Sequence, residues 1–145
     1  MLNVMCSNGL RPVLTCSRER GGPDFTCGER AISLYGRPVH GALPEPDTVL
    51  TSYRLEGVVP IETVALLVEV SDSTLGTDLG RKADLYADAG VREYWVVDLN
   101  EDRVLCHVNP REDGSGYDGQ LDVLFGTPLY AATVDGLTVE TVSLD

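Results

Sequence analysis

The alternation of apolar and polar residues is regular only from about residue 44 onwards. The run VALLVEV (64–70) is almost continuously apolar, which is typical of a strand buried on both faces. Similar but shorter patterns predict strands at 48–53, 93–99 and 103–108, followed by YDGQLDVLF, PLYAATV and LTVETVSL. Asp135-Gly136 is a turn pair that would join the last two as a hairpin. The C-terminal part is therefore expected to consist of β-hairpins.

A helix is predicted between the strands at 64–70 and 93–99. Thr77 or Asp78 can cap its N-terminus, and Gly90 is a natural stop after Ala89. The order strand, strand, helix, strand, strand predicts an α/β fold in which a helix packs on a mixed sheet.

The helix has one polar residue on its apolar side. At about 100° per residue, Arg81 falls on the solvated face and Lys82 falls between Tyr86 and Ala89, within the apolar arc. Lys82 is therefore predicted to point towards the sheet. The alternative is that its stem covers apolar surface while its amine reaches water.

Residues 1–43 carry weak periodicity, with Gly, Pro, Ser and Arg scattered through them. One strand is predicted near 31–35, and the rest is expected to be loop or disordered. We therefore divide the chain into a poorly defined N-terminal segment, 1–43, and a single domain over 44–145.

Composition restricts the possible functions. The chain has 145 residues and a net charge of −12, which argues against nucleic-acid binding by general electrostatics but suits divalent cations. Four cysteines without a CxxC pair and two histidines do not fit a zinc site, so we expect reduced thiols. We find neither a signal peptide nor an apolar run of the ~20 residues needed to span a membrane, so we expect a cytoplasmic protein.

Three charged residues suggest a catalytic site. Glu69 interrupts the apolar strand, where an ionised carboxylate is costly unless it is paired or bound to metal. The alternative is an exposed strand end at which Glu69 meets water or an arginine. Asp47, at the start of another strand, offers a second carboxylate, and two carboxylates suit Mg²⁺. Lys82 beside them could orient water or stabilise charge on phosphorus.

The segments PEPD, VEVSDSTLGTD, GRKADLYADAG and VREYWVVDLN, in this order, resemble the Uma2 family over about residues 44–140. Members of that family resemble the PD-(D/E)XK nucleases, so the resemblance implies the restriction-endonuclease-like fold, a mixed sheet with flanking helices. It also implies that Asp47, Glu69 and the backbone carbonyl of Val70 bind Mg²⁺ or Mn²⁺. Ser71 occupies the usual position of the motif lysine, and Lys82 matches the relocated catalytic lysine.

Two further residues are expected to support this site. Tyr86 lies four residues after Lys82 and on the same face of the helix. Asp78 either caps the helix or orients Lys82, and we favour the cap.

The resemblance implies a metal-dependent endonuclease that hydrolyses phosphodiester bonds of nucleic acid, with DNA as the expected substrate and a 5′-phosphate as the product. A homodimer is plausible by the same resemblance. The alternative is a catalytically inactive interaction module with a nuclease fold. It arises because the family's N-terminal helical segment, which contributes an acidic residue, is not recognisable here, and Glu29 is the nearest candidate.

Overall fold

The computed structural model describes residues 2–4, 14–18, 26–28, 32–33, 46–73 and 75–141. The strands are β1 (Leu2–Val4), β2 (Leu14–Arg18), β3 (Thr26–Gly28), β4 (Ile32–Ser33), β5 (Thr48–Thr51), β6 (Val59–Pro60), β7 (Val64–Ser71), β8 (Glu93–Asp98), β9 (Arg103–Pro110), β10 (Tyr117–Leu124), β11 (Leu129–Tyr130) and β12 (Leu137–Thr141). The helical elements are a 3₁₀ turn (Ile61–Thr63), α1 (Leu75–Thr77), a π-helical turn (Asp78–Lys82) and α2 (Ala83–Asp88).

A six-stranded sheet in the order β10-β9-β8-β7-β5-β3 forms the centre of the molecule. It is mixed, because β7 and β8 are parallel while the other neighbouring strands in it are antiparallel. The long apolar strand β7 lies between β5 and β8 and is covered on both faces, as its sequence predicts. The predicted α/β fold with a mixed sheet is confirmed.

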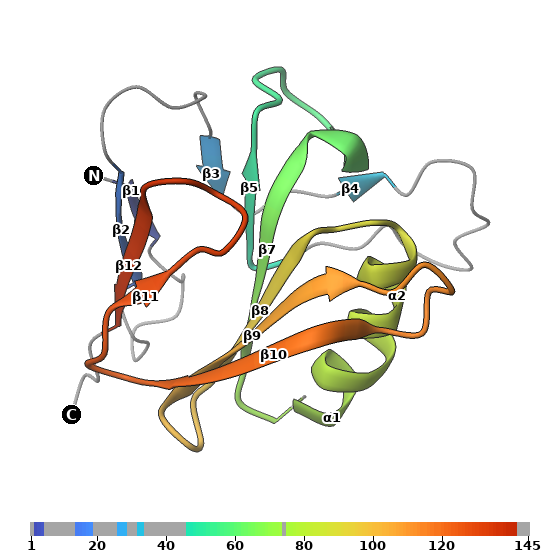
Figure 1. The fold of residues 1–145 in the computed structure, drawn as a ribbon. Helices are drawn as coiled ribbons and strands as arrows, with labels where there is room; N and C mark the ends of the chain where they lie inside the picture. The colour runs from blue at the N-terminus through green and yellow to red at the C-terminus, as the bar shows by residue number, and fades with distance from the viewer. Residues whose placement is uncertain are drawn as a thin grey trace.

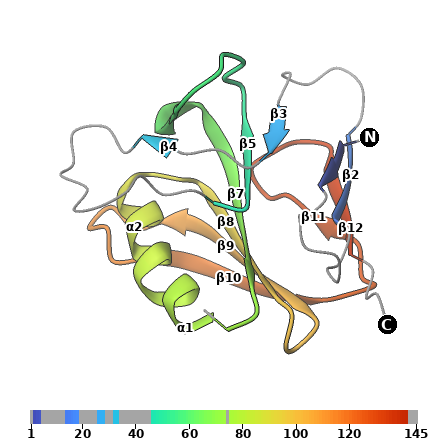
Figure 2. The same ribbon diagram turned by 180° about the vertical axis from the view of Figure 1, so that it is seen from behind.

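The central sheet separates two layers (Figure 1). The helix formed by α1, the π turn and α2 covers one face, where Leu67, Tyr86 and Tyr94 are buried together. A smaller sheet in the order β1-β2-β12-β11 lies at the other face, where Trp95 packs with Leu137. Figure 2 shows the same arrangement from behind, with the helix and the small sheet on opposite sides of the central strands.

The N-terminal segment contributes more strands than the sequence predicts. Strand β4 lies within the predicted 31–35 strand. The expectation that the rest is loop or disordered is wrong for β1, β2 and β3, because β3 extends the central sheet beside β5 and β2 pairs with β12. These strands have only three to five residues, and β2 and β3 pair with strands that lie further along the chain, while β1 pairs with β2. Short strands that depend on such tertiary pairing leave little local pattern.

The C-terminal hairpin forms between β11 and β12, with Leu129 opposite Val139. The predicted strand 128–134 is too long, since β11 ends at Tyr130. The reason is that the backbone N–H groups of Ala132 and Thr133 donate to the side chain of Glu93 instead of joining a strand ladder. Within the part of the chain that the structure describes, no helix is long and apolar enough to cross a membrane.

Candidate active site

Glu69 lies near the carboxyl end of β7 and faces the helix. Its strand is flanked by β5 and β8, and the residue is only 4% exposed. The alternative of an exposed strand end is therefore wrong. The side chain meets Lys82 and Tyr86 rather than water or arginine.

Lys82 is the single lysine of the chain and is directed at Glu69. Its Nζ lies 3.4 Å from Oε2 of Glu69 and 2.9 Å from Oδ1 of Asp78, and its side chain is 37% exposed. The predicted orientation towards the sheet is confirmed. Because the amine is placed between two buried carboxylates, the alternative of an amine that simply reaches water does not describe it.

Tyr86 holds the other oxygen of Glu69. Its hydroxyl donates to Oε1 at 3.1 Å, and its side chain is buried. Lys82 and Tyr86 come from successive turns of one helix face, so they approach the carboxylate of Glu69 together.

Asp78 lies within the helix rather than at its N-cap position, so the favoured N-cap assignment is wrong, and Thr77 makes no side-chain cap hydrogen bond. The helical conformation is already present at Leu75, and Asp78 begins the π turn with its side chain 1% exposed. Its carboxylate pairs with Lys82, four residues on. The second reading of Asp78, orientation of the lysine, is the one that this contact supports.

Asp47 precedes β5 and lies beside the end of β7. Its Oδ2 accepts a 2.7 Å hydrogen bond from the backbone N–H of Val70. Thr48 is opposite Val68 in the antiparallel register, so the next pair in line brings Asp47 opposite Glu69. Val70 itself directs its side chain to the core on the other face of the sheet. Two carboxylates and the backbone of Val70 therefore meet at one end of β7.

Burial dominates the electrostatics of Glu69. It raises the pKa of Glu69 to about 7, opposed by the charge of Lys82 and the Tyr86 hydrogen bond and reinforced by the charges of Asp47 and Asp78. Partial burial lowers the pKa of Lys82, but the hydrogen bond with Asp78 and the charge of Glu69 raise it above its ordinary value overall. The site thus joins three carboxyl groups to one ammonium and has an excess of acidic groups.

This donor set fits a hard divalent cation. No group of three or more His, Cys, Asp or Glu side chains arranged to hold a metal occurs among the residues that the structure describes. Mg²⁺, however, is commonly held by one or two carboxylates, with waters or substrate oxygens completing its shell. Asp47 and Glu69 meet that requirement, and a cation beside Glu69 would favour its ionised form despite burial.

Tyr94 is a residue near the site that sequence reasoning missed. It lies on β8, is fully buried, and donates from its hydroxyl to the backbone carbonyl of Asp78 at 3.0 Å. The sequence signal was its alternation with Trp95, which directs the two side chains to opposite faces of the sheet. The π turn that it contacts could not be read from a pattern that assumes α-helical geometry.

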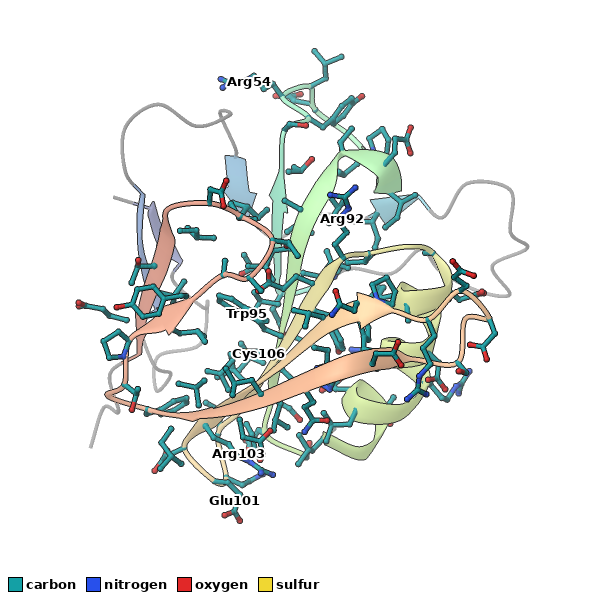
Figure 3. The ribbon with its side chains drawn as sticks, in the orientation of Figure 1. Arg54, Arg92, Trp95, Glu101, Arg103 and Cys106 are labelled. Carbon is teal, nitrogen blue, oxygen red and sulfur yellow. The ribbon has the colours of Figure 1, made fainter. Side chains whose placement is uncertain are left out.

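Three other residues of the central sheet have structural positions: Trp95, Cys106 and His107. Trp95 is buried in the core and lies opposite Cys106 on the neighbouring strand (Figure 3). Burial raises the pKa of the Cys106 thiol to about 12, in keeping with an unreactive thiol. His107 is buried against the backbone carbonyl of Tyr94.

Comparison with known proteins gives one family match. The model of the Uma2 family, described as "Putative restriction endonuclease", matches residues 10–137. The matched range begins well before residue 44, so it includes much of the N-terminal segment. No curated protein matches the chain. Glu29, the candidate for an additional acidic residue, lies outside the residues that the structure describes.

Proposed function

The chain belongs to the Uma2 family, and we propose that it is a metal-dependent endonuclease that hydrolyses phosphodiester bonds of DNA. The observation that carries this proposal is the contact of the chain's single lysine with a buried glutamate, Lys82 Nζ to Glu69 Oε2, beside a second carboxylate. Burying that glutamate without a ligand is unfavourable, and strongly perturbed acidic groups of this kind concentrate at functional sites.

The proposed cation is Mg²⁺ or Mn²⁺, held by Asp47, Glu69 and the carbonyl oxygen of Val70. Such a cation would lower the pKa of a bound water and offset negative charge on the phosphate. Asp47 has a second task, because its hydrogen bond to the Val70 N–H ties the start of β5 to the end of β7. It therefore also holds its own strand and Glu69 in register.

Lys82 acts directly on the reacting phosphate in this proposal, and its partners hold it and Glu69 in position. Water attacks phosphorus, the bond from phosphorus to O3′ breaks, and the products are a 5′-phosphate and a 3′-hydroxyl. The ammonium of Lys82 orients the water and stabilises the charge that gathers on the phosphoryl oxygens. Asp78 and Tyr86 do not touch the phosphate; they hold Lys82 and Glu69 in position.

The acidic balance of the chain bears on how DNA would bind. A net charge of −12 disfavours tight binding by a single copy, because affinity for DNA depends on neutralising phosphates with basic groups. We therefore propose that the bound cation and a second subunit contribute to substrate binding. Binding of this kind is expected to be weak and strongly dependent on salt.

The test is a cleavage assay with Mg²⁺ and Mn²⁺ on supercoiled plasmid, single-stranded DNA and RNA. Lys82→Ala is compared with Arg81→Ala, which removes the same charge from the neighbouring exposed residue. Glu69→Gln is compared with Glu62→Gln at an exposed position. We expect metal-dependent cleavage that falls by at least about 100-fold in Lys82→Ala and Glu69→Gln but not in the controls.

Two results would contradict the proposal. Equal cleavage by Glu69→Gln and the wild-type protein would remove the proposed metal site. No cleavage by folded wild-type protein on any of the substrates would favour the inactive interaction module instead.

A further inference from the structure

The helix that carries Lys82 contains a π-helical turn at the candidate site. Asp78 is the first residue of this turn and Lys82 is the last, and α1 and α2 flank it on either side. A π turn closes i→i+5 hydrogen bonds, so it accommodates an extra residue and shifts the register of the side chains that follow. Such turns are rare and occur frequently at functional sites.

Tyr94 contacts this turn from the central sheet. Its hydroxyl donates to the carbonyl oxygen of Asp78, and its ring packs edge-on against Tyr86, with 5.0 Å between the ring centroids. Tyr94 therefore touches both the residue that begins the π turn and the tyrosine that donates to Glu69. No part of its side chain is exposed, so these contacts are shielded from competing water.

We propose that Tyr94 is a positioning residue, whose bond to the Asp78 carbonyl fixes the π turn in the register that directs the Lys82 amine between Asp78 and Glu69. The role in catalysis rests on the proposed function; the role in placing Lys82 does not. Without the hydroxyl, the buried carbonyl loses a donor that water cannot replace, and the turn is free to move towards α-helical register. A change of one residue in register rotates a side chain by about 100°, enough to carry the amine away from Glu69.

Tyr117 supplies the matched control for this role. It stacks on Tyr94, with 6.4 Å between ring centroids, and its hydroxyl also donates to a backbone carbonyl, that of Val91, at 2.8 Å. Val91 lies beyond the π turn. Tyr94→Phe and Tyr117→Phe therefore each delete one hydroxyl from the same aromatic cluster, and only the first reaches Asp78.

The experiment uses the fact that Lys82 is the single lysine. Protein labelled with ¹³C-lysine gives one lysine side-chain signal, and its position and width report the immobilisation of the amine without substrate or metal. We expect Tyr94→Phe to sharpen the signal and move it towards that of free lysine, and to speed modification of Lys82 by an amine reagent several-fold. Tyr117→Phe should change neither readout. If nuclease activity is found, Tyr94→Phe should lower kcat with little change in KM.

An unchanged Lys82 signal and modification rate in folded Tyr94→Phe would overturn the proposal. An equal change in Tyr117→Phe would also overturn it, because the effect would then come from loss of packing in the aromatic cluster and not from the bond to Asp78. If Tyr94→Phe does not fold, 3-fluorotyrosine at position 94 alone keeps the hydroxyl and makes it a stronger donor. The Lys82 signal must then move away from that of free lysine, and a signal that stays in place counts against the role.

Discussion

Two buried glutamates on neighbouring strands of the central sheet have different environments. Glu69 on β7 is 4% exposed and faces the helix, whereas Glu93 on β8 is 1% exposed and faces the small sheet. Both would be costly as isolated charges. The comparison therefore depends on the groups that surround each carboxylate.

The fold surrounds Glu93 with hydrogen-bond donors. Oε1 accepts from the backbone N–H and the hydroxyl of Thr133 at 2.9 and 2.8 Å, and Oε2 accepts from the indole of Trp95 and the N–H of Ala132 at 2.8 and 3.2 Å. Glu69 has one tyrosine hydroxyl and a lysine amine 3.4 Å away, and burial raises its pKa to about 7. Glu93 thus stabilises the loop between β11 and β12, whereas Glu69 has fewer hydrogen-bond donors around it among the residues that the structure describes, in keeping with the ligand role proposed above.

The largest expected effect in this comparison is the loss of stability in Glu93→Gln. The amide can present one acceptor oxygen, so its NH₂ group must face donors that the carboxylate accepted, and a buried donor without a partner is costly. We expect a loss of about 3 kcal/mol in the free energy of unfolding, measured by urea denaturation. If Glu93→Gln were as stable as the wild-type protein, the four hydrogen bonds would not define a structural role for Glu93.

Glu69→Gln should have the opposite effect at pH 8. The folded-state pKa of about 7 exceeds the ordinary 4.5, so Glu69 holds its proton in the folded protein over a pH range where the unfolded chain has released it. Its contribution to stability is complete below about pH 4.5 and is lost as the pH rises through 7. Gln does not titrate, so the variant should gain on the order of 1–3 kcal/mol relative to wild type between pH 5 and pH 8.

The measurement is the free energy of unfolding of both proteins at several pH values without metal. Subtracting the two curves removes the contributions of groups that the substitution does not affect. Exposed Glu62→Gln is the control and should follow the wild-type curve. A difference between Glu69→Gln and wild type that stays constant from pH 5 to pH 8 would show that burial does not raise the pKa of Glu69.

The next largest expected effect is the stabilisation by a divalent cation, which should depend on Glu69 but not on Glu93. Binding to the folded protein at ten times the dissociation constant stabilises it by about 1.4 kcal/mol, which corresponds to a few degrees in Tm. We expect Mn²⁺ or Mg²⁺ to raise the Tm of wild type and of Glu93→Gln, but not of Glu69→Gln or Asp47→Asn. Asn at position 47 keeps an oxygen that can accept from the Val70 N–H, so this variant isolates the charge. Equal shifts in all four proteins would place the cation elsewhere.

The sequence predicts the region around Glu69 better than the region around Glu93. The strand β7 and the face of the helix carry strong patterns, and these patterns place Glu69 and Lys82 towards each other. The sequence predicted no structural role for Glu93. Its hydrogen-bond partners at 132–133 lie about forty residues further along the chain, in a segment that was predicted to be a strand. Long-range capture of a loop by a side chain leaves no periodic signal.

Two features of the structure were not predicted from the sequence pattern, the π turn at the site and the short N-terminal strands. The helical wheel assumes about 100° per residue, so it cannot reveal a π turn. Asp78 was predicted as a cap from its residue type, because the helix was expected to begin near residue 78 rather than at Leu75. The short N-terminal strands escaped for the reason given above, although the family match includes most of that segment. Strong local patterns thus predicted the core and the positions of Glu69 and Lys82. The π turn and the N-terminal strands depend on tertiary contacts that such patterns do not record.

The smallest expected effect concerns the hydroxyl that donates a hydrogen bond to Glu69, that of Tyr86. Tyr86→Phe removes the 3.1 Å hydrogen bond to Oε1, and because this bond lowers the pKa of Glu69, its loss should raise that pKa further above 7. The expected loss of stability is about 0.5–1.5 kcal/mol at pH 8, where Glu69 is mostly ionised, and less at pH 5, where the protonated carboxyl is present with or without the hydroxyl. A ¹³C-carboxyl titration of Glu69 and urea denaturation at both pH values measure the two effects. Tyr117→Phe is the control, because the hydroxyl of Tyr117 donates to the carbonyl of Val91 and not to Glu69. If the pKa of Glu69 moves equally in both variants, the difference between the two glutamates does not depend on their individual hydrogen-bond donors.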